Sequence, residues 1–302
     1  MLPSKSCEAF LAVAELGSFE AAALHLNLSA SAVTLRVQAL EKQLSQVLLV
    51  RERPCRVTSS GLHLLRHLQQ QRLHEQQLLQ HIQGSRQHQT FQEFHIASNA
   101  DSLATWLLPL LQPVLLEHRM ILKLRLDDQS QTHQLLENGL VSACISTEKT
   151  AMQGCTAAYL GDMTYKMVAS PDFVARYLQQ PLNRERLKHI PAVIFDAKDH
   201  LHHQMILKLF GLQQNQYPHY FVPSSTAFVD AIHLGLGFGL VPEYQMGTDL
   251  QTGKLIEILP EAKTAMSLYW HHWQQQTAAL NVITAHLLKY AQAHMQGQQK
   301  SP

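Results

Sequence analysis

Small polar side chains interrupt apolar sequence in the segment SNADSLATWLLPLL, residues 98–111. Their hydroxyl, amide and carboxylate groups exchange hydrogen bonds with a ligand, and the carboxylate neutralises a cation. A loop that only connects two elements needs one or two turn residues, so this many polar groups favour a ligand-binding wall. The residues of this predicted wall are Ser98, Asn99, Asp101, Ser102 and Thr105.

Further polar residues stand where other predicted strands end. They are Asp128, Ser146, Thr147, Asp196 and Ser225. Each alone is compatible with an ordinary helix cap. Ligands of open α/β sheets bind outside the carboxyl ends of strands, so convergence of these residues at one cleft favours a binding site. Asp101, Asp128 and Asp196 would neutralise an ammonium or guanidinium while helix N-termini hold a carboxylate, which fits a small cationic amino acid.

An alternation of strands and helices that begins near Phe91 must position these residues. The apolar patterns predict strands at 94–97, 121–126, 141–146, 165–169, 192–195, 220–222, 239–241 and 267–273. The first is followed by the polar wall and by one helix to about Glu117. We expect a two-lobe α/β domain over 91–302, with lobe 1 at about 91–163 and 265–302, lobe 2 at about 164–264, and a cleft between them.

The first 58 residues predict three short helices and a hairpin. Ser18 and Ser29 are typical N-caps, and the helix after Ser29 turns its apolar face inward. The residues of that face are Ala32, Val33, Val37, Leu40 and Leu44. A short helix, a brief turn and a longer helix form the helix-turn-helix pattern, whose second helix enters the major groove of DNA. The outward residues predicted to contact DNA are Ser29, Ala30, Ser31, Thr34, Leu35 and Arg36.

Two short strands, at 47–51 and 55–57, flank the turn Glu52-Arg53-Pro54. Arg51, Arg53 and Arg56 on this hairpin are predicted to reach phosphates or a minor groove, although a solvated hairpin would also carry arginines. A long helix follows within the linker segment 59–90. Because a single helix cannot bury its own apolar face, this helix needs a partner. Its predicted dimerisation seam is Leu65, Leu68, Leu79 and Ile82, with Arg72 and Glu75 at the two middle positions.

The residues of the head resemble those of LysR-type transcriptional regulators, and the resemblance extends over the whole chain. The matching positions are Ala21, Ala22, Leu26, Ser29, Ala32, Val33, Thr34, Leu40, Glu41, Leu48, Arg51, Thr58 and Gly61. Two positions depart from the family pattern. Ala30 and Ser31 stand where the family often has Gln followed by Pro or Ser, and Ser45-Gln46 replaces a common Gly before the hairpin.

The segments SNADSLATWLLPLL, AVIFD, SSTAFV and LYWH resemble the branch of this family that responds to arginine or lysine. The resemblance implies an N-terminal winged helix-turn-helix, a long dimerisation helix and a C-terminal two-lobe α/β effector domain of the type II periplasmic-binding-protein kind. It implies binding to double-stranded promoter DNA, self-association into dimers or dimers of dimers, and contact with RNA polymerase. The genes controlled would serve export or metabolism of basic amino acids.

Other functional classes receive less support. Residues 1–90 carry nine Lys or Arg against six Asp or Glu, and the remainder carries fifteen against seventeen, so only the head is basic. Cys7, Cys55, Cys144 and Cys155 are widely spaced, the histidine clusters lack ligand spacing, and GLGFGL lies in the wrong order for dinucleotide binding. We therefore expect a cytoplasmic protein without catalysis, metal, cofactor or membrane span. The open alternatives are another small anionic or amino-acid effector, or a solute-binding protein or transferase on the same two-lobe body.

Overall fold

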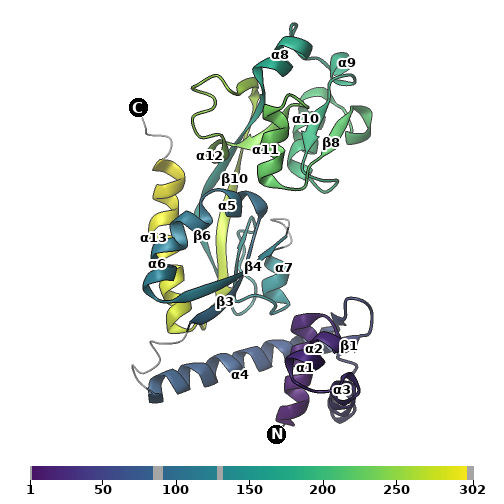
Figure 1. The fold of residues 1–302 in the computed structure, drawn as a ribbon, viewed down its shortest axis with the longest axis vertical. Helices are drawn as coiled ribbons and strands as arrows, with labels where there is room; N and C mark the ends of the chain where they lie inside the picture. Colours follow the sequence, from purple (N-terminus) through teal and green to yellow (C-terminus); the bar gives the residue numbers. More distant parts are fainter. Residues whose placement is uncertain (1, 84–90, 128–131, 298–302) are drawn as a thin grey trace.

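The computed structural model describes residues 2–83, 91–127 and 132–297. Three helices form the head: α1 Ser4–Leu16, α2 Phe19–His25 and α3 Ala30–Leu44 (Figure 1). Gly17, with a φ of 69°, ends α1 in the left-handed region that glycine adopts without a steric penalty. The hydroxyl oxygens of Ser18 and Ser29 accept hydrogen bonds from the amides of Ala21 and Ala32, as the two predicted caps require.

The head has a core of its own. Phe10 and Val13 of α1 pack with Val33, Val37 and Leu40 of α3, and all five side chains are fully buried. A two-stranded antiparallel hairpin follows, with β1 Leu49–Val50 and β2 Arg56–Val57. Both strands are shorter than predicted, because only two residue pairs are in register before the turn begins.

The linker helix α4 spans Ser59–Gln83. Leu65 and Leu68 pack into the core of the head, so these two side chains are not available to the predicted dimerisation seam. Arg72 pairs with Glu15 of α1 at 2.7 Å, a contact within the chain. The side chains of Leu79 and Ile82 lie outside the described residues, and the seam therefore stays a prediction for the far half of α4.

A second set of contacts connects α4 and the head to lobe 1 of the same chain. Arg66 Nε donates to the backbone oxygen of Glu137 at 2.7 Å. Arg125 Nη2, at the end of β4, donates to the backbone oxygen of Glu15 at 3.3 Å. In Figure 1, α4 accordingly runs from the head along one end of lobe 1.

The body is built on a six-stranded sheet of order β4-β3-β5-β10-β6-β9. Its strands are β3 Gln92–Ser98, β4 Met120–Leu126, β5 Ala143–Ser146, β6 Cys155–Ala169, β9 Gly239–Pro242 and β10 Ile256–Trp273. In lobe 1, β3 is parallel to both β4 and β5, whereas β10 is antiparallel to β5 and β6. Two long strands, β6 and β10, run through both lobes and form the two crossing segments.

Helices cover both faces of the lobe 1 sheet. They are α5 Ala100–Ala104, α6 Leu107–Glu117, α7 Thr132–Glu137 and the closing helix α13 Ala278–Gly297. Ile96 of β3 lies in the same core cluster as the apolar residues of α6 and α13, while its neighbour Ala97 packs with Leu136 of α7. This alternation is the two-residue period of a strand that is buried on both faces.

Lobe 2 contains a small parallel sheet of β7 Ala192–Ile194 and β8 His219–Phe221. Its helices are α8 Pro171–Tyr177, α9 Arg184–Leu187, α10 His200–Phe210, the 3-10 turn η2 Gln214–Gln216, α11 Ser225–His233 and α12 Glu243–Met246. A bridge between Ala192 and Phe238 joins β7 to the segment that enters β9. None of the helices in the described ranges 2–83, 91–127 and 132–297 is long and apolar enough to cross a membrane.

Three predicted elements of the body differ most from the structure. The single helix expected after the polar wall is broken into α5 and α6, because Thr105 has a non-helical ψ of −84° and its hydroxyl donates to the backbone oxygen of Asp101. The last strand, predicted at 267–273, begins eleven residues earlier, at Ile256. The crossing strand predicted at 165–169 begins ten residues earlier, at Cys155. Pairing with β10 extends it, and that long-range partner leaves no alternating pattern in the local sequence.

Candidate functional site

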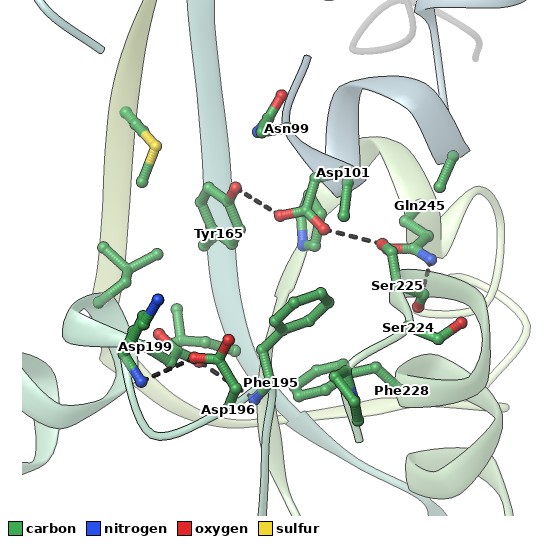
Figure 2. A pocket seen from close by; sticks show the side chains of 18 of the residues that line it. Asn99, Asp101, Tyr165, Phe195, Asp196, Asp199, Ser224, Ser225, Phe228 and Gln245 are labelled. Atoms are coloured by element: carbon green, nitrogen blue, oxygen red, sulfur yellow. Dashed lines mark hydrogen bonds between the residues drawn. The ribbon is translucent and has the colours of Figure 1, made fainter. Parts of the chain in front are cut away.

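A cavity of about 800 Å³ opens between the two lobes. Lobe 1 supplies Asn99 and Asp101 at the start of α5, and lobe 2 supplies residues around the starts of α10 and α11 (Figure 2). Tyr165 of the crossing strand β6 lines the cavity between these two groups of residues, as the same figure shows. The cavity has the size of a small-molecule site and lies at the carboxyl end of β3.

Asp101 joins the lobes by hydrogen bonds. The Tyr165 hydroxyl donates to Asp101 Oδ2 at 2.8 Å, and the Ser225 hydroxyl donates to Asp101 Oδ1 at 2.8 Å. Gln245 Nε2 in turn donates to the backbone oxygen of Ser225 at 2.8 Å. Because Asp101 belongs to lobe 1 and Ser225 to lobe 2, one carboxylate bridges the cleft from wall to wall, as Figure 2 shows.

Carboxylates gather around this cavity. Asp101, Asp127, Asp196 and Asp199 line it, and Lys198 is the lysine among its described lining residues. Burial raises the pKa of Asp101, opposed by its hydrogen bonds from Tyr165 and Ser225. Burial also raises the pKa of Asp199, as do the nearby charges of Asp101 and Asp196, against the effect of two backbone amides. The negative charges of Asp101 and Asp196, which act on Asp199 inside the cavity, make it favourable for a cation.

Two helices begin at the lobe 2 wall and differ in their caps. Asp199 caps α10, because its carboxylate accepts from the amide of His202 at 3.1 Å and from that of Phe195 at 3.3 Å. Ser224 precedes α11 without a side-chain cap hydrogen bond in the described structure. The N-terminus of α11, a helix of nine residues, therefore favours an anionic group of a ligand.

The structure brings half of the predicted cleft residues to the cavity. Asn99, Asp101, Thr147, Asp196 and Ser225 line it. Asp128 lies outside the described residues. The remaining four, Ser98, Ser102, Thr105 and Ser146, are not among its lining residues.

Those four side chains are buried or hydrogen-bonded to nearby backbone instead of facing the cavity. Ser98 is fully buried and donates to the backbone oxygen of Asn99, while Ser102 is the fully buried residue of α5. Thr105 holds the last turn of α5, and Ser146 Oγ accepts from the amide of Glu148 at 3.2 Å. The polar segment thus divides into a cavity-facing part and a part that shapes the loop.

Sequence reasoning missed several lining residues. In the sequence, Asp199 is recognisable only as the residue before a helix. It lies three positions after Asp196 and could have been predicted to line the cleft with it. Tyr165, Phe195 and Phe228 look like core residues in the sequence, and Gln245 carries no local signal. Their placement depends on strand β6 and on the packing of lobe 2.

The hairpin of the head carries three arginines, each beside a glutamate. Arg51 lies 3.8 Å from Glu41 and stacks over the Phe19 ring at 5.4 Å from its centroid. Arg56 pairs with Glu52 at 2.6 Å, while Arg53 is 91% exposed with Glu20 at 3.4 Å. Arg53 is thus the most accessible of the three side chains for a phosphate.

Two family models together match nearly the whole chain. The model described as "Bacterial regulatory helix-turn-helix protein, lysR family" matches residues 4–62, and the "LysR substrate binding domain" matches residues 87–292. The chain belongs to the LysR family of transcriptional regulators. The match to the helix-turn-helix model favours a transcriptional regulator over the solute-binding protein or transferase that the sequence left open.

Related proteins cover the chain from end to end. The HTH-type transcriptional regulator ArgP of Vibrio parahaemolyticus is 38% identical over 97% of this LysR chain and 98% of its own length. ArgP of Pseudomonas fluorescens is 36% identical over 96% of both chains. Both relatives are named as regulators, which supports the LysR branch indicated by the four segments of the sequence.

Solved LysR-type structures share the same architecture. The crystal structure of ArgP from Mycobacterium tuberculosis has a TM-score of 0.81 at 33% identity, covering 96% of this chain and 98% of its own. Full-length LysG from Corynebacterium glutamicum with bound effector Arg has a TM-score of 0.74 at 30% identity, covering 95% and 97%. The predicted fold class, a winged head followed by a two-lobe body, is confirmed.

The histidines do not form a metal centre in the described part of this LysR chain. No group of three or more potential ligands among His, Cys, Asp and Glu lies together there. His271 Nε2 forms a hydrogen bond of 2.6 Å with the backbone oxygen of Glu148, and His202 is fully buried in lobe 2. These two histidines therefore belong to the packing of the body rather than to an ion site.

Proposed function

We propose that this LysR-family regulator binds arginine or lysine between its lobes and thereby controls transcription of genes for export or metabolism of basic amino acids. The observation that carries the proposal is that four aspartates line the cleft together with the N-terminus of α11, which has no side-chain cap in the described structure. A basic amino acid presents a side-chain cation and an α-carboxylate, which are complementary to these two features. The ArgP relatives and the arginine-bound LysG structure support the same class of effector.

In this proposal, the cavity-lining residues contact the effector and the residues behind the wall position them. Asp101, Asp196 and Asp128 would interact with the cationic groups, while Ser225 and the amides of α11 would bind the α-carboxylate. Asn99 and Thr147 would add hydrogen bonds from lobe 1. Ser98 and Thr105 would hold the loop that carries Asn99 and Asp101, and Ser102 would pack inside α5. Ser146 would hold the turn that follows β5.

The head would act on double-stranded promoter DNA through α3 and the hairpin, and the protein would work in the cytoplasm as a dimer or a dimer of dimers. Contact with RNA polymerase is part of the same proposal, and no cofactor is required. Closure of the lobes on the effector would change the position of the paired heads, because a ligand favours the conformation to which it binds more tightly.

Isothermal titration calorimetry of the full-length protein tests the effector. We expect arginine or lysine to bind, while citrulline and norleucine, which keep the shape of the side chain without its charge, bind at least tenfold more weakly. Glutamate is the matched anionic ligand for the alternative effector class. Heat with glutamate and none with arginine or lysine would overturn the proposal.

Replacing Arg53 with alanine should weaken promoter binding and reduce the slope of log affinity against log salt by about one, because one phosphate contact is lost. Fluorescence anisotropy at several salt concentrations measures both quantities. Lys263→Ala removes an exposed charge from β10 of the body and should leave the slope unchanged. An unchanged slope in Arg53→Ala would contradict the role of the hairpin as a wing.

A further inference from the structure

Helix α3 presents an apolar side chain at the centre of its outer face. Leu35 is 65% exposed, although the inward residues of the same helix are fully buried. With 3.6 residues per turn, Ser31, Leu35 and Gln38 share one face, opposite the buried Val33 and Val37. An exposed leucine there lies on the surface that a helix-turn-helix inserts into the major groove.

The hydroxyl groups next to Leu35 already have partners within the helix. Ser31 Oγ lies 2.9 Å from Ser29 Oγ, and Ser29 Oγ also accepts from the amide of Ala32. The Thr34 hydroxyl donates to the backbone oxygen of Ala30 at 2.8 Å. In the first two turns of α3, Leu35 is therefore the large exposed side chain without hydrogen-bonding atoms, and the hydroxyl groups of Ser31 and Thr34 beside it already have a partner.

We propose that Leu35 reads thymine by packing against its C5-methyl group in the major groove. In unmodified DNA the thymine methyl is the apolar group that a base pair displays in that groove, and leucine has no hydrogen-bonding atom to read anything else. Bringing the two apolar surfaces together removes both from water, which favours thymine over every other base at that position. The contact makes Leu35 a determinant of DNA sequence, whichever effector the cleft binds.

Replacement of thymine by deoxyuridine tests this contact, because it removes the methyl group and leaves the base pair intact. The full-length protein first selects its preferred duplex from a random pool, and each thymine of that duplex is then replaced in turn. We expect one or two positions in each half-site at which uracil weakens binding about three- to fivefold, the effect of one buried methyl group. Leu35→Ala should bind the thymine and uracil duplexes equally.

Two variants and one modified base control the experiment. Leu35→Met keeps an apolar side chain of similar reach and should retain the preference for thymine. Leu24→Ala removes an 81% exposed leucine from α2, outside α3, and should also retain the full preference. A 5-methylcytosine–guanine pair at the sensitive position should bind more tightly than the unmethylated cytosine pair. The proposal is overturned if uracil changes nothing in the unaltered protein, if its effect persists in Leu35→Ala, or if the selected duplex contains no thymine under α3.

Discussion

Replacing Asp101 with asparagine should weaken arginine or lysine binding about 10- to 100-fold, which corresponds to the loss of a charged hydrogen bond of roughly 1.5 to 3 kcal/mol. The asparagine side chain would keep the shape of the aspartate and one acceptor oxygen, but it would lose the negative charge. Asp101 is the carboxylate that bonds to both Tyr165 of the crossing strand and Ser225 of lobe 2. Calorimetry on the two proteins measures the ratio of dissociation constants.

The pH dependence of binding supplies a second measurement of the same residue. Burial raises the pKa of Asp101, so part of its carboxyl population is protonated at a pH where an exposed aspartate is fully charged. A cationic effector binds the charged form, so affinity should increase as the pH rises through this raised pKa, and binding should release protons there. The Asp101→Asn protein has no such proton and should lose this part of the pH dependence.

The same shift predicts the sign of the stability change. An acid whose pKa is higher in the folded state than in the unfolded state costs folding free energy once the pH exceeds its unfolded pKa, and the full cost is present above the folded pKa. Asp101→Asn removes this cost, so the variant should be at least as stable as the unaltered protein at neutral pH. Thermal unfolding without effector checks this expectation.

The matched control for Asp101 is an aspartate that does not line the cavity. Asp230 is an exposed residue of α11, and Asp230→Asn removes the same charge without touching a cavity-lining residue. We expect its affinity for arginine to remain within twofold of the unaltered protein. Equal losses in the two variants would show that long-range charge, rather than the contact at Asp101, determines affinity.

The sequence was informative where a signal is local. Ser29 followed by an apolar face predicts the start of α3, and the structure shows the same cap. Val33, Val37 and Leu40 are buried as predicted, whereas Ala32 and Leu44 are only half-buried. Asp101 was predicted at the cleft because its segment follows an apolar strand, and ligands of α/β sheets bind at the carboxyl ends of strands. Its neighbours Ser98 and Ser102 belong to the same polar segment but are fully buried and do not line the cavity, and that division depends on the backbone of α5.

The parts that could not be predicted depend on distant partners. Strand β6 begins at Cys155 because β10 pairs with it, and Tyr165 reaches the cavity only because β6 crosses between the lobes. Gln245 contacts Ser225, which is twenty positions away, through the packing of α11 and α12. Leu65 and Leu68 have the spacing of a dimer seam, yet the core of their own head is near enough to bury them.

The bond between Asp101 and Ser225 connects the proposed binding step to lobe closure. An effector carboxylate at the N-terminus of α11 and an effector cation at Asp101 would compete for the two groups that now bond to each other. A ligand that replaces this bond by two of its own still links the lobes, but with a different separation between them. The contacts of Arg66 and Arg125 between lobe 1, α4 and the head provide a physical connection for that change.

Replacing His202 with phenylalanine should make the protein markedly less sensitive to mild acid. His202 is fully buried between the rings of Tyr217 and Phe238, and neither of its ring nitrogens has a hydrogen-bond partner among the described residues. Burial, with smaller contributions from His219 and His203, lowers its pKa to about 3 from an ordinary value near 6.5. The neutral ring must therefore be the form present in the folded protein.

The sign of this effect follows from the protons bound in each state. Between pH 6.5 and 3 the unfolded chain protonates His202 and the folded protein does not, so stability falls as the pH falls below 6.5. The contribution at pH 5 is about 2 kcal/mol, which lowers the melting temperature by several degrees. Thermal unfolding at pH 7.5 and pH 5 should show a smaller fall for His202→Phe than for the unaltered protein. His200→Phe, an exposed change at the start of the same helix, should retain the full fall, and an equal fall in all three proteins would contradict the assignment to His202.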